Sequence, residues 1–526
     1  MLALLSVSLV ALFTQYAHAQ VRFAKTYGGT NWDQAFSVHQ TSDGGYIVAG
    51  YTNSFGAGVY DFFLIKTDAN GNIIWAKTYG GTDDDRAYSV QQTSDGGYIV
   101  AGYTNSFGEG SRDIFLIKTD ANGNIIWAKT YGGTGNEWPS SAQQTSDGGY
   151  IVAGLTGSFG AGSADAFLIK TDANGNIQWA KTYGGADHDE AYSIQQTSDG
   201  GYIVAVWTRS FGAGNFDFFL IKTDANGNII WSKTYGGASD DRVNSVQQTS
   251  DGGYIVAGRT SSFGAGSVDA FLIKTDANGN IIWAKTYGGA SDDRVNSVQQ
   301  TSDGGYIVAG HTMSFGAGDR DIFLIKTDAN GNLQWAKTYG GTGSDWAYSV
   351  QQTSDGGYIV AGWTGSFGAG SRDAFLVKTD ANGNIGSCEI SGNANPTETE
   401  PLVTVNPPSP TVTDLTLILT VTPVTSPPLT VTSPDLTIIA PCPLSDDNEL
   451  GISESCKPAS GIITPYKGGI KITKSGEFEV KVYNVSGVMV KSVKGKEEVK
   501  LELSRGVYFV EVVSVGKVLR EKVVIR

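Results

Sequence analysis

Short apolar segments alternate with polar turn segments along most of the chain. One such stretch, from Ala35, reads AFSVHQT-SDGG-YIVAGYT-NSFGAGVY-DFFLIKTD-ANGN-IIWAKTYGG. The segments between the turns are rich in Val, Ile, Tyr, Phe and Thr, as β-strands are. The SDGG and ANGN stretches favour tight turns, because glycine and asparagine tolerate positive φ angles. No segment shows the apolar period of a helix. The pattern predicts four antiparallel strands in each stretch.

The pattern recurs with a fixed period. The tyrosine of KTYGG stands at Tyr27, Tyr79, Tyr131, Tyr183, Tyr235, Tyr287 and Tyr339, and each step is 52 residues. A period of this size is typical of solenoids, propellers and arrays. Seven four-stranded units predict an all-β fold with a seven-bladed β-propeller over residues 20–388.

The two ends of the repeat region are complementary. The stretch VRFAKTYGG at 21–29 is the tail of a repeat with no unit before it, and the seventh unit ends at Ile385 without its fourth strand. We expect the first strand to complete the last blade, because a closed ring leaves no free sheet edge there. An open solenoid would instead need polar capping repeats, which the sequence does not show.

The repeats resemble a known bacterial family. A Trp before a YGG strand, a DGGYIVAG hairpin and a hairpin that ends in NGN recur over residues 21–385. They look like SBBP-type bacterial β-propeller repeats. The resemblance implies an exported protein and supplies no catalytic motif.

Three further segments complete the predicted domain organisation. Residues 1–19 contain an apolar run followed by Ala17-His18-Ala19, which indicates a secretory signal peptide. Residues 389–460 are rich in Thr, Pro, Val and Ser and favour an extended linker, although their alternating LTVT pieces favour short strands as the alternative. Residues 461–526 alternate apolar and polar positions and predict a small β-sandwich.

The C-terminal module also carries a resemblance. Its VKVYNVSGVMV, LSRGVYFVEV and closing KVVIR segments are similar to the sorting domain of type IX secretion. The resemblance implies the export machinery as a partner and a secreted protein attached to the outer cell surface.

Charge, apolar runs and cysteine content narrow the class of protein. Residues 457–526 carry a net charge of +7 and the rest of the chain carries −22. An acidic body argues against binding of nucleic acid, whose phosphates need a basic surface. Beyond the leader no apolar run is long enough to span a membrane. The only cysteines are Cys388, Cys442 and Cys456, and Cys388 and Cys442 are the candidates for a single bridge after export.

Variation among the repeats is concentrated on one predicted face. The turns between the first and second and between the third and fourth strands are nearly identical in all units, whereas the other two loops vary. Loops on a rigid scaffold commonly carry binding sites. Most of the candidate ligand-binding residues are aromatic, suited to a sugar or a protein partner, although blade packing is the alternative role. They are Trp32, Tyr51, Tyr103, Trp138, Trp207, Arg259, His311, Trp346 and Trp363.

The same loops carry carboxylates. Clustered carboxylate oxygens suit Ca²⁺, and a solvated acidic rim is the alternative. The candidate ligands are Asp84, Asp85, Asp187, Asp189, Asp240, Asp241, Asp292 and Asp293. No other cofactor is indicated.

No catalytic constellation stands out. The histidines beyond the leader lie in separate repeats, and no H-E-x-x-H or G-x-S-x-G motif is present. The sequence therefore predicts a binding or adhesion module for a glycan or a surface protein. The alternatives are a polysaccharide lyase or hydrolase that uses carboxylates in the channel, and a structural envelope protein.

Overall fold

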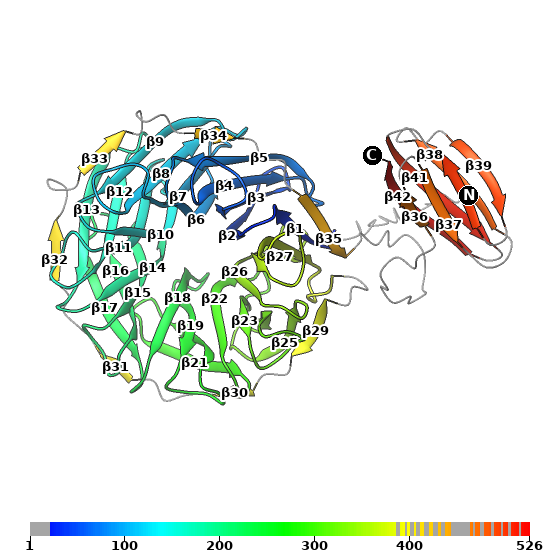
Figure 1. Ribbon diagram of the computed structural model, residues 1–526. Coiled ribbons are helices and arrows are strands. Elements are labelled where there is room, and N and C mark those ends of the chain that lie inside the picture. Colours follow the sequence, from blue (N-terminus) through cyan, green and yellow to red (C-terminus); the bar gives the residue numbers. More distant parts are fainter. Residues whose placement is uncertain are drawn as a thin grey trace, which may run out of the picture. The chain divides into compact units, whose positions relative to one another are not determined.

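The computed structural model describes residues 21–385 and Ile390, and the strands that lie between residues 391 and 525 (Figure 1). Contacts divide the chain into two compact units, Met1–Leu450 and Gly451–Arg526. The predicted signal peptide lies outside the described residues, as do Cys388 and Cys456. No helix in the described part of the chain is long and apolar enough to cross a membrane.

The first unit is a ring of seven sheets, so the predicted propeller is confirmed. The innermost strands are β2 (Asp33–Gln40), β6 (Asp85–Gln92), β10 (Glu137–Gln144), β14 (Asp189–Gln196), β18 (Asp241–Gln248), β22 (Asp293–Gln300) and β26 (Asp345–Gln352). The second strands are β3 (Tyr46–Thr52), β7 (Tyr98–Thr104), β11 (Tyr150–Thr156), β15 (Tyr202–Thr208), β19 (Tyr254–Thr260), β23 (Tyr306–Thr312) and β27 (Tyr358–Thr364). The third strands are β4 (Asp61–Thr67), β8 (Asp113–Thr119), β12 (Asp165–Thr171), β16 (Asp217–Thr223), β20 (Asp269–Thr275), β24 (Asp321–Thr327) and β28 (Asp373–Thr379). The fourth strands are β5 (Ile73–Gly80), β9 (Ile125–Gly132), β13 (Ile177–Gly184), β17 (Ile229–Gly236), β21 (Ile281–Gly288), β25 (Leu333–Tyr339) and β1 (Phe23–Gly28).

Strand β1 closes the ring as the sequence predicts. It pairs antiparallel with β28, with Phe23 opposite Lys378 and Tyr27 opposite Ala374. The hydroxyl of Tyr27 donates to the carbonyl of Gly71 in the first blade at 2.7 Å. The last blade therefore contains strands from both ends of the repeat region and is joined to the first blade by a buried hydrogen bond.

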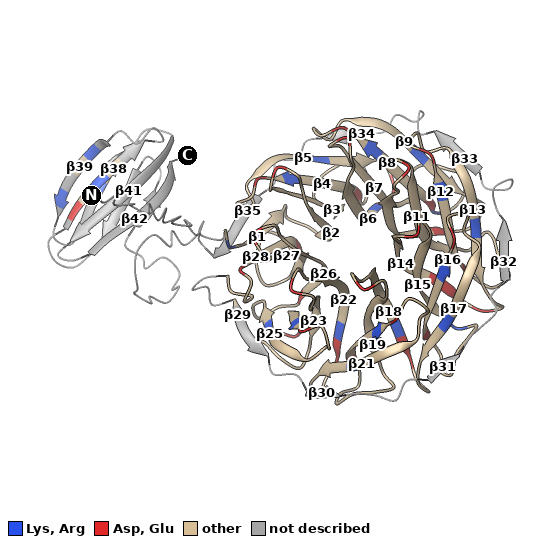
Figure 2. Ribbon diagram, turned by 180° about the vertical axis from the view of Figure 1, so that it is seen from behind, with Lys and Arg blue, Asp and Glu red and all other residues tan. Residues whose placement is uncertain are grey.

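Apolar side chains fill the space between neighbouring blades. Phe62 and Leu64 of β4 are fully buried and pack with Val100 and Phe115 of the next blade. Equivalent clusters follow around the ring. The predicted hairpin turns depend on glycine, since Gly44 and Gly71 have φ angles of 82° and 71°. Beside the first turn, Lys66 Nζ lies 2.8 Å from Asp43 Oδ2, and the same pair recurs around the ring, where Figure 2 shows the charged residues.

The Thr/Pro-rich segment adds a fifth strand to every blade (Figure 1). Its strands are β29 (Ser391–Ala394), β30 (Thr397–Thr399), β31 (Thr404–Asn406), β32 (Thr411–Asp414), β33 (Thr420–Pro423), β34 (Thr430–Thr432) and β35 (Thr437–Cys442). They pair in chain order with β25, β21, β17, β13, β9, β5 and β1, so the seven strands follow one another once around the outside of the ring. We call these strands the belt.

The belt decides between the two interpretations of this segment. The seven described pieces between residues 391 and 442 are short added strands, as the alternative interpretation predicts. The physical reason is that each fourth strand would otherwise present a row of unpaired backbone groups at the outer edge of its blade. Val and Thr favour such strands, and proline is tolerated on edge strands because they need few donors.

The second unit consists of two antiparallel sheets. One contains β36 (Ile463–Tyr466), β37 (Gly469–Thr473) and β40 (Glu498–Glu502). The other contains β38 (Phe478–Asn484), β39 (Met489–Gly495), β41 (Gly506–Ser514) and β42 (Lys517–Ile525). Val480 and Val482 of β38 are fully buried, as a small apolar core requires.

Removal of the belt should expose the fourth strands. We expect amides of β5, β13 and β21 to exchange hydrogen about fivefold faster in a chain that ends at residue 388, because each lost hydrogen bond contributes about 1 kcal/mol. Amides of the second strands β3 and β11 are the internal control. Hydrogen exchange with mass spectrometry measures both sets, and equal exchange of β5 in the two chains would contradict the belt.

Candidate functional site

The variable loops lie together on one face, as predicted. The backbone of Tyr60, which ends a loop of the first blade, bridges to Asp84 before the second blade, and the amide of Asp85 donates to the carbonyl of Tyr60 at 2.8 Å. Similar bridges occur at most other blade junctions, including Trp32 to Arg372 across the closure of the ring. The innermost strands begin at this face and run toward the face of the constant turns.

Each innermost strand contains a β-bulge near its start. In β2 the register shifts between Ala35 and Ser37, so Phe36 has no partner on β3. A bulge turns a side chain away from the regular alternation of the strand. The seven bulged residues are Phe36, Tyr88, Ser140, Tyr192, Asn244, Asn296 and Tyr348.

All seven bulged residues line one cavity at the variable end of the central channel. Its volume is about 640 Å³, and Trp138, Leu155, His188 and Glu190 contribute to its wall. The cavity thus draws residues from all seven blades. We call it the channel-mouth cavity.

One side of the channel-mouth cavity is aromatic. The ring centroid of Phe36 lies 4.4 Å from that of Tyr348 and 5.1 Å from that of Tyr88. Tyr88 in turn lies 5.8 Å from Trp138. Burial raises the pKa of Tyr88 well above its ordinary value, so its hydroxyl is a neutral hydrogen-bonding group. These rings offer flat apolar surface with hydroxyls at the edge.

The other side is polar. Nδ2 of Asn244 donates to the carbonyl of Val295 at 2.7 Å, and Nδ2 of Asn296 donates to the carbonyl of Ala347 at 2.7 Å. His188 Nε2 and Glu190 Oε2 are 3.3 Å apart. Neutral amides, hydroxyls and one carboxylate therefore face an aromatic wall across a single cavity.

The nine predicted ligand-binding residues divide into two groups. Trp138 lines the channel-mouth cavity, whereas the others lie around or beneath it. Tyr51 and Tyr103 are buried, and their hydroxyls donate to Gln34 Oε1 at 2.9 Å and Asp84 Oδ2 at 3.0 Å. Trp207 stacks behind Tyr192 at 3.9 Å.

Three of the remaining predicted residues form one stack. His311 is buried and stacks on Trp346 at 3.8 Å, and Trp346 stacks on Trp363 at 5.6 Å. Burial, with Arg294 nearby, lowers the pKa of His311 to about 3, so its ring is neutral. Burial and the neighbouring Arg294 and Arg242 lower the pKa of Arg259 to about 10.

Arginine side chains pack against several of these rings, both exposed and buried. The guanidinium of Arg372 lies 4.4 Å from the ring of Trp32, which is 40% exposed, and 4.2 Å from that of Trp363. Arg112 lies 4.9 Å from Tyr103 and 4.8 Å from Trp138. Cation–π pairs of this kind stabilise the rim. Much of the predicted aromatic surface is therefore packing around the channel-mouth cavity.

Sequence reasoning did not single out the bulged residues. They end the variable stretches that follow each YGG, as in TDDDRAY and ASDDRVN, but their inward direction depends on the bulge. The available signal was a position that changes among Phe, Tyr, Ser and Asn within an otherwise constant strand.

The predicted calcium ligands have other partners. Asp84, Asp240 and Asp292 each pair with the arginine two residues later, at 2.8–3.1 Å. Asp85, Asp189, Asp241 and Asp293 are fully buried and accept hydrogen bonds from serine hydroxyls. Asp187 is exposed. Among the described residues, no group of three or more His, Cys, Asp or Glu side chains is placed to hold one metal ion.

The buried carboxyls instead form pairs between blades. A Cβ on Gly80 would lie 2.0 Å from Asp61 Oδ1 and 2.8 Å from Asp85 Oδ2, so the two carboxyls flank this glycine closely. Burial, with the charge of Asp85, raises the pKa of Asp61 to about 6, although the amides of Gly58 and Ala57 oppose the shift. The corresponding pairs are Asp373 with Asp33, Asp113 with Glu137, Asp165 with Asp189, Asp217 with Asp241, Asp269 with Asp293 and Asp321 with Asp345.

Two known families match parts of this chain, one in the propeller and one in the C-terminal module. Residues 464–526 match the secretion system C-terminal sorting domain, and residues 41–73 and 353–385 match a β-propeller domain of unknown function, DUF5122. Both resemblances expected from the sequence are confirmed. The sorting domain indicates secretion and attachment to the outer cell surface, with the secretion machinery as a partner.

The individual proteins that this chain resembles share little sequence identity with it. The regulatory protein FlaEY of Caulobacter vibrioides is 27% identical over 238 residues, which are 40% of this chain and 24% of that protein. Among solved structures, a puromycin hydrolase matches 69% of this chain and 54% of its own, with 12% identity and a TM-score of 0.39. An endo-1,5-α-L-arabinanase from Thermotoga petrophila matches 67% of this chain and 99% of its own, with 11% identity and a TM-score of 0.26.

The carboxyl pairs predict an unusual pH dependence. Because the folded pKa of Asp61, Asp113, Asp217, Asp269 and Asp373 is about 6, above the ordinary 3.8, the folded state binds more protons between these values. Their contribution to stability is present below pH 4 and is lost as the pH rises through 6. We expect Asp61→Asn, which replaces a buried carboxylate that is mostly ionised at pH 7 with a neutral amide, to stabilise the fold at pH 7 by about 1 kcal/mol.

Thermal unfolding from pH 4.5 to 7.5 measures this effect. Asp43→Asn is the matched control with the opposite sign, because hydrogen bonds from Lys66 and Thr41 outweigh burial and lower the pKa of Asp43 to about 2. That variant should lose stability at pH 7. A wild-type stability that rises from pH 5 to 7, or an Asp61→Asn variant less stable than wild type, would refute the assignment.

Proposed function

We propose that this secreted, surface-attached propeller binds a carbohydrate in the channel-mouth cavity. The observation that carries the proposal is the composition of the seven bulged residues, which place an aromatic wall opposite amides and hydroxyls in one cavity. Aromatic rings suit the apolar faces of sugar rings, and neutral donors and acceptors suit their hydroxyls. The cavity volume of about 640 Å³ has room for a short saccharide.

The contacts of the cavity support binding by preformed groups. Phe36 is held between Tyr348 at 4.4 Å and Tyr51 at 5.4 Å, so its ring is fixed before any ligand arrives. The amides of Asn244 and Asn296 are held by backbone carbonyls of the next blade. Groups that are already ordered lose little entropy on binding.

The carboxylate content favours binding over hydrolysis. A glycosidase needs two carboxyl groups that flank the scissile bond. Among the described residues that line the cavity, Glu190 is the only carboxylate, and it pairs with His188. The carboxyl pairs between blades do not line this cavity. A polysaccharide-active enzyme remains the alternative, with His188 and Glu190 as its proton-transfer groups.

Binding of the full chain to an immobilised polysaccharide panel tests the proposal. We expect saturable binding to at least one polysaccharide, weakened about tenfold by Tyr88→Ala or Tyr348→Ala, because each variant removes one ring from the aromatic wall. Trp32→Ala is the control, since Trp32 is an exposed ring on the same face outside the cavity.

Other outcomes discriminate among the alternatives. Loss of binding in Trp32→Ala with retention in Tyr88→Ala would move the site from the cavity to the rim. Release of soluble sugar during the assay would favour the enzyme, and its loss in Glu190→Gln would assign the acid. Binding that requires calcium and is removed by chelator would restore the acidic loops as ligands. Absence of binding across the panel would contradict a carbohydrate.

A further inference from the structure

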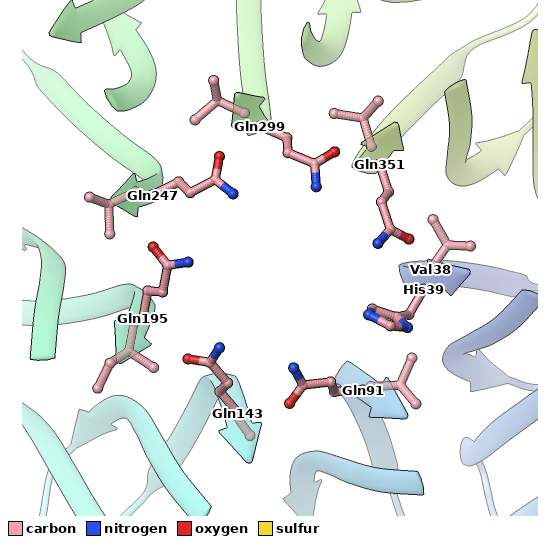
Figure 3. Close-up of a pocket in the computed structure, with 14 residues that line it drawn as sticks. Val38, His39, Gln91, Gln143, Gln195, Gln247, Gln299 and Gln351 are labelled. Carbon is pink, nitrogen blue, oxygen red and sulfur yellow. The ribbon is translucent and has the colours of Figure 1, made fainter. Parts of the chain in front are cut away.

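A second ring of side chains surrounds the channel nearer the constant face. It consists of Gln91, Gln143, Gln195, Gln247, Gln299 and Gln351, one from each of six innermost strands, and His39 occupies the seventh position (Figure 3). With the valine or other apolar residue before each of them, they line a cavity of about 240 Å³. We call these six amides and the imidazole the amide ring.

The orientation of the six amides is fixed by the neighbouring blades. Oε1 of Gln91 accepts a hydrogen bond from the backbone N–H of Gln144 at 2.7 Å, and Oε1 of Gln247 accepts one from that of Gln300 at 2.6 Å. The other four amides accept equivalent bonds at 2.5–2.8 Å. A backbone N–H can only donate, so each bond identifies the amide oxygen and leaves the NH₂ group on the other side.

The free NH₂ groups converge. Figure 3 shows the amide nitrogens of the six glutamines directed toward the centre of the ring and the oxygens directed away from it. No carboxylate is among the described residues that line this cavity. His39 is half-buried, and its Nδ1 makes no hydrogen bond among the described residues. The cavity therefore contains many inward donors, while the acceptor atoms of the amides are already used.

We propose that the amide ring binds an oxyanion, such as a sulfate, phosphate or carboxylate group, at the constant end of the channel. Convergent N–H donors stabilise negative charge even without a formal positive charge, and hydrogen bonds to charged acceptors are stronger than neutral ones. The ring is separate from the channel-mouth cavity, so either site can fail without the other. The anion is either a free inorganic ion or a charged group on a larger polymer.

Calorimetric titration of the full chain in low-chloride buffer tests the proposal. The probes are sodium sulfate, sodium phosphate and dextran sulfate. The discriminating variant is Gln247→Glu, which keeps an oxygen for the N–H of Gln300 and replaces the inward NH₂ with a carboxylate oxygen. We expect binding to weaken by about tenfold or more, because a donor is lost and a like charge is added.

The matched control is Gln248→Glu, which makes the same charge change one residue away. Gln248 does not line the cavity, and its Oε1 accepts from the N–H of Ser198 at 2.8 Å, which a glutamate also permits. This variant should bind as wild type does. His39→Gln completes the ring with a seventh amide and should retain or strengthen binding. This variant tests the proposal even where Gln247→Glu does not fold.

Each result has a definite meaning. Saturable binding of inorganic sulfate or phosphate that Gln247→Glu abolishes and Gln248→Glu retains supports a free ion as the ligand. Binding of dextran sulfate alone, with the same dependence on Gln247, supports a charged group on a polymer. Equal binding by the two glutamate variants, or no binding of any probe to wild type, would overturn the proposal.

Discussion

The pairing of β1 with β28 is the constraint on which the rest of the structure depends. These strands are about 350 residues apart in the chain, and their backbone hydrogen bonds convert a row of repeats into a ring. Without them β28 would present an open edge, and the first and last blades would lack the buried contacts that Tyr27 makes with Gly71. Ring closure also brings the seven innermost strands around one axis. Both cavities of the channel exist because of that closure.

The two ends of the channel differ because residues at the constant end make a hydrogen bond that repeats in nearly every blade, whereas the bulged residues at the variable end do not. At the constant end, Gln91 accepts a hydrogen bond from the backbone of the next blade, and the other five glutamines of the amide ring do the same. These bonds repeat around the ring, so the same residue type is needed in nearly every blade. At the variable end, the bulge leaves Phe36 and its equivalents without an opposing residue on the second strand. An unpaired position tolerates different side chains, so seven equivalent sites supply aromatic, amide and hydroxyl groups to one cavity.

The belt gives the Thr/Pro-rich segment a structural role. Its strands are three to six residues long, and they cover the outer edges of all seven blades in reverse chain order. Exposed strand edges are sites of unwanted pairing with other chains, which matters for a protein displayed at a surface. The belt leaves each fourth strand, β1 included, paired on both sides. The strands that follow the last repeat therefore pair with the blade edges that would otherwise be open to other chains.

The sequence by itself determined the seven blades, their four strands, the closing strand and the identity of the variable face, because strand alternation, turn residues and repeat period are local properties that can be read along the chain. It also determined the sorting module. Tertiary structure decided where the sites lie. Tyr51 and Trp207 looked like surface aromatics in the sequence, but Tyr51 is buried and Trp207 packs against an apolar cluster between blades, whereas Phe36 and Tyr88 enter the channel because a bulge turns them inward. The amide ring and the belt likewise depend on contacts between distant segments, and no local pattern specifies which amide oxygen or strand edge such a contact will occupy.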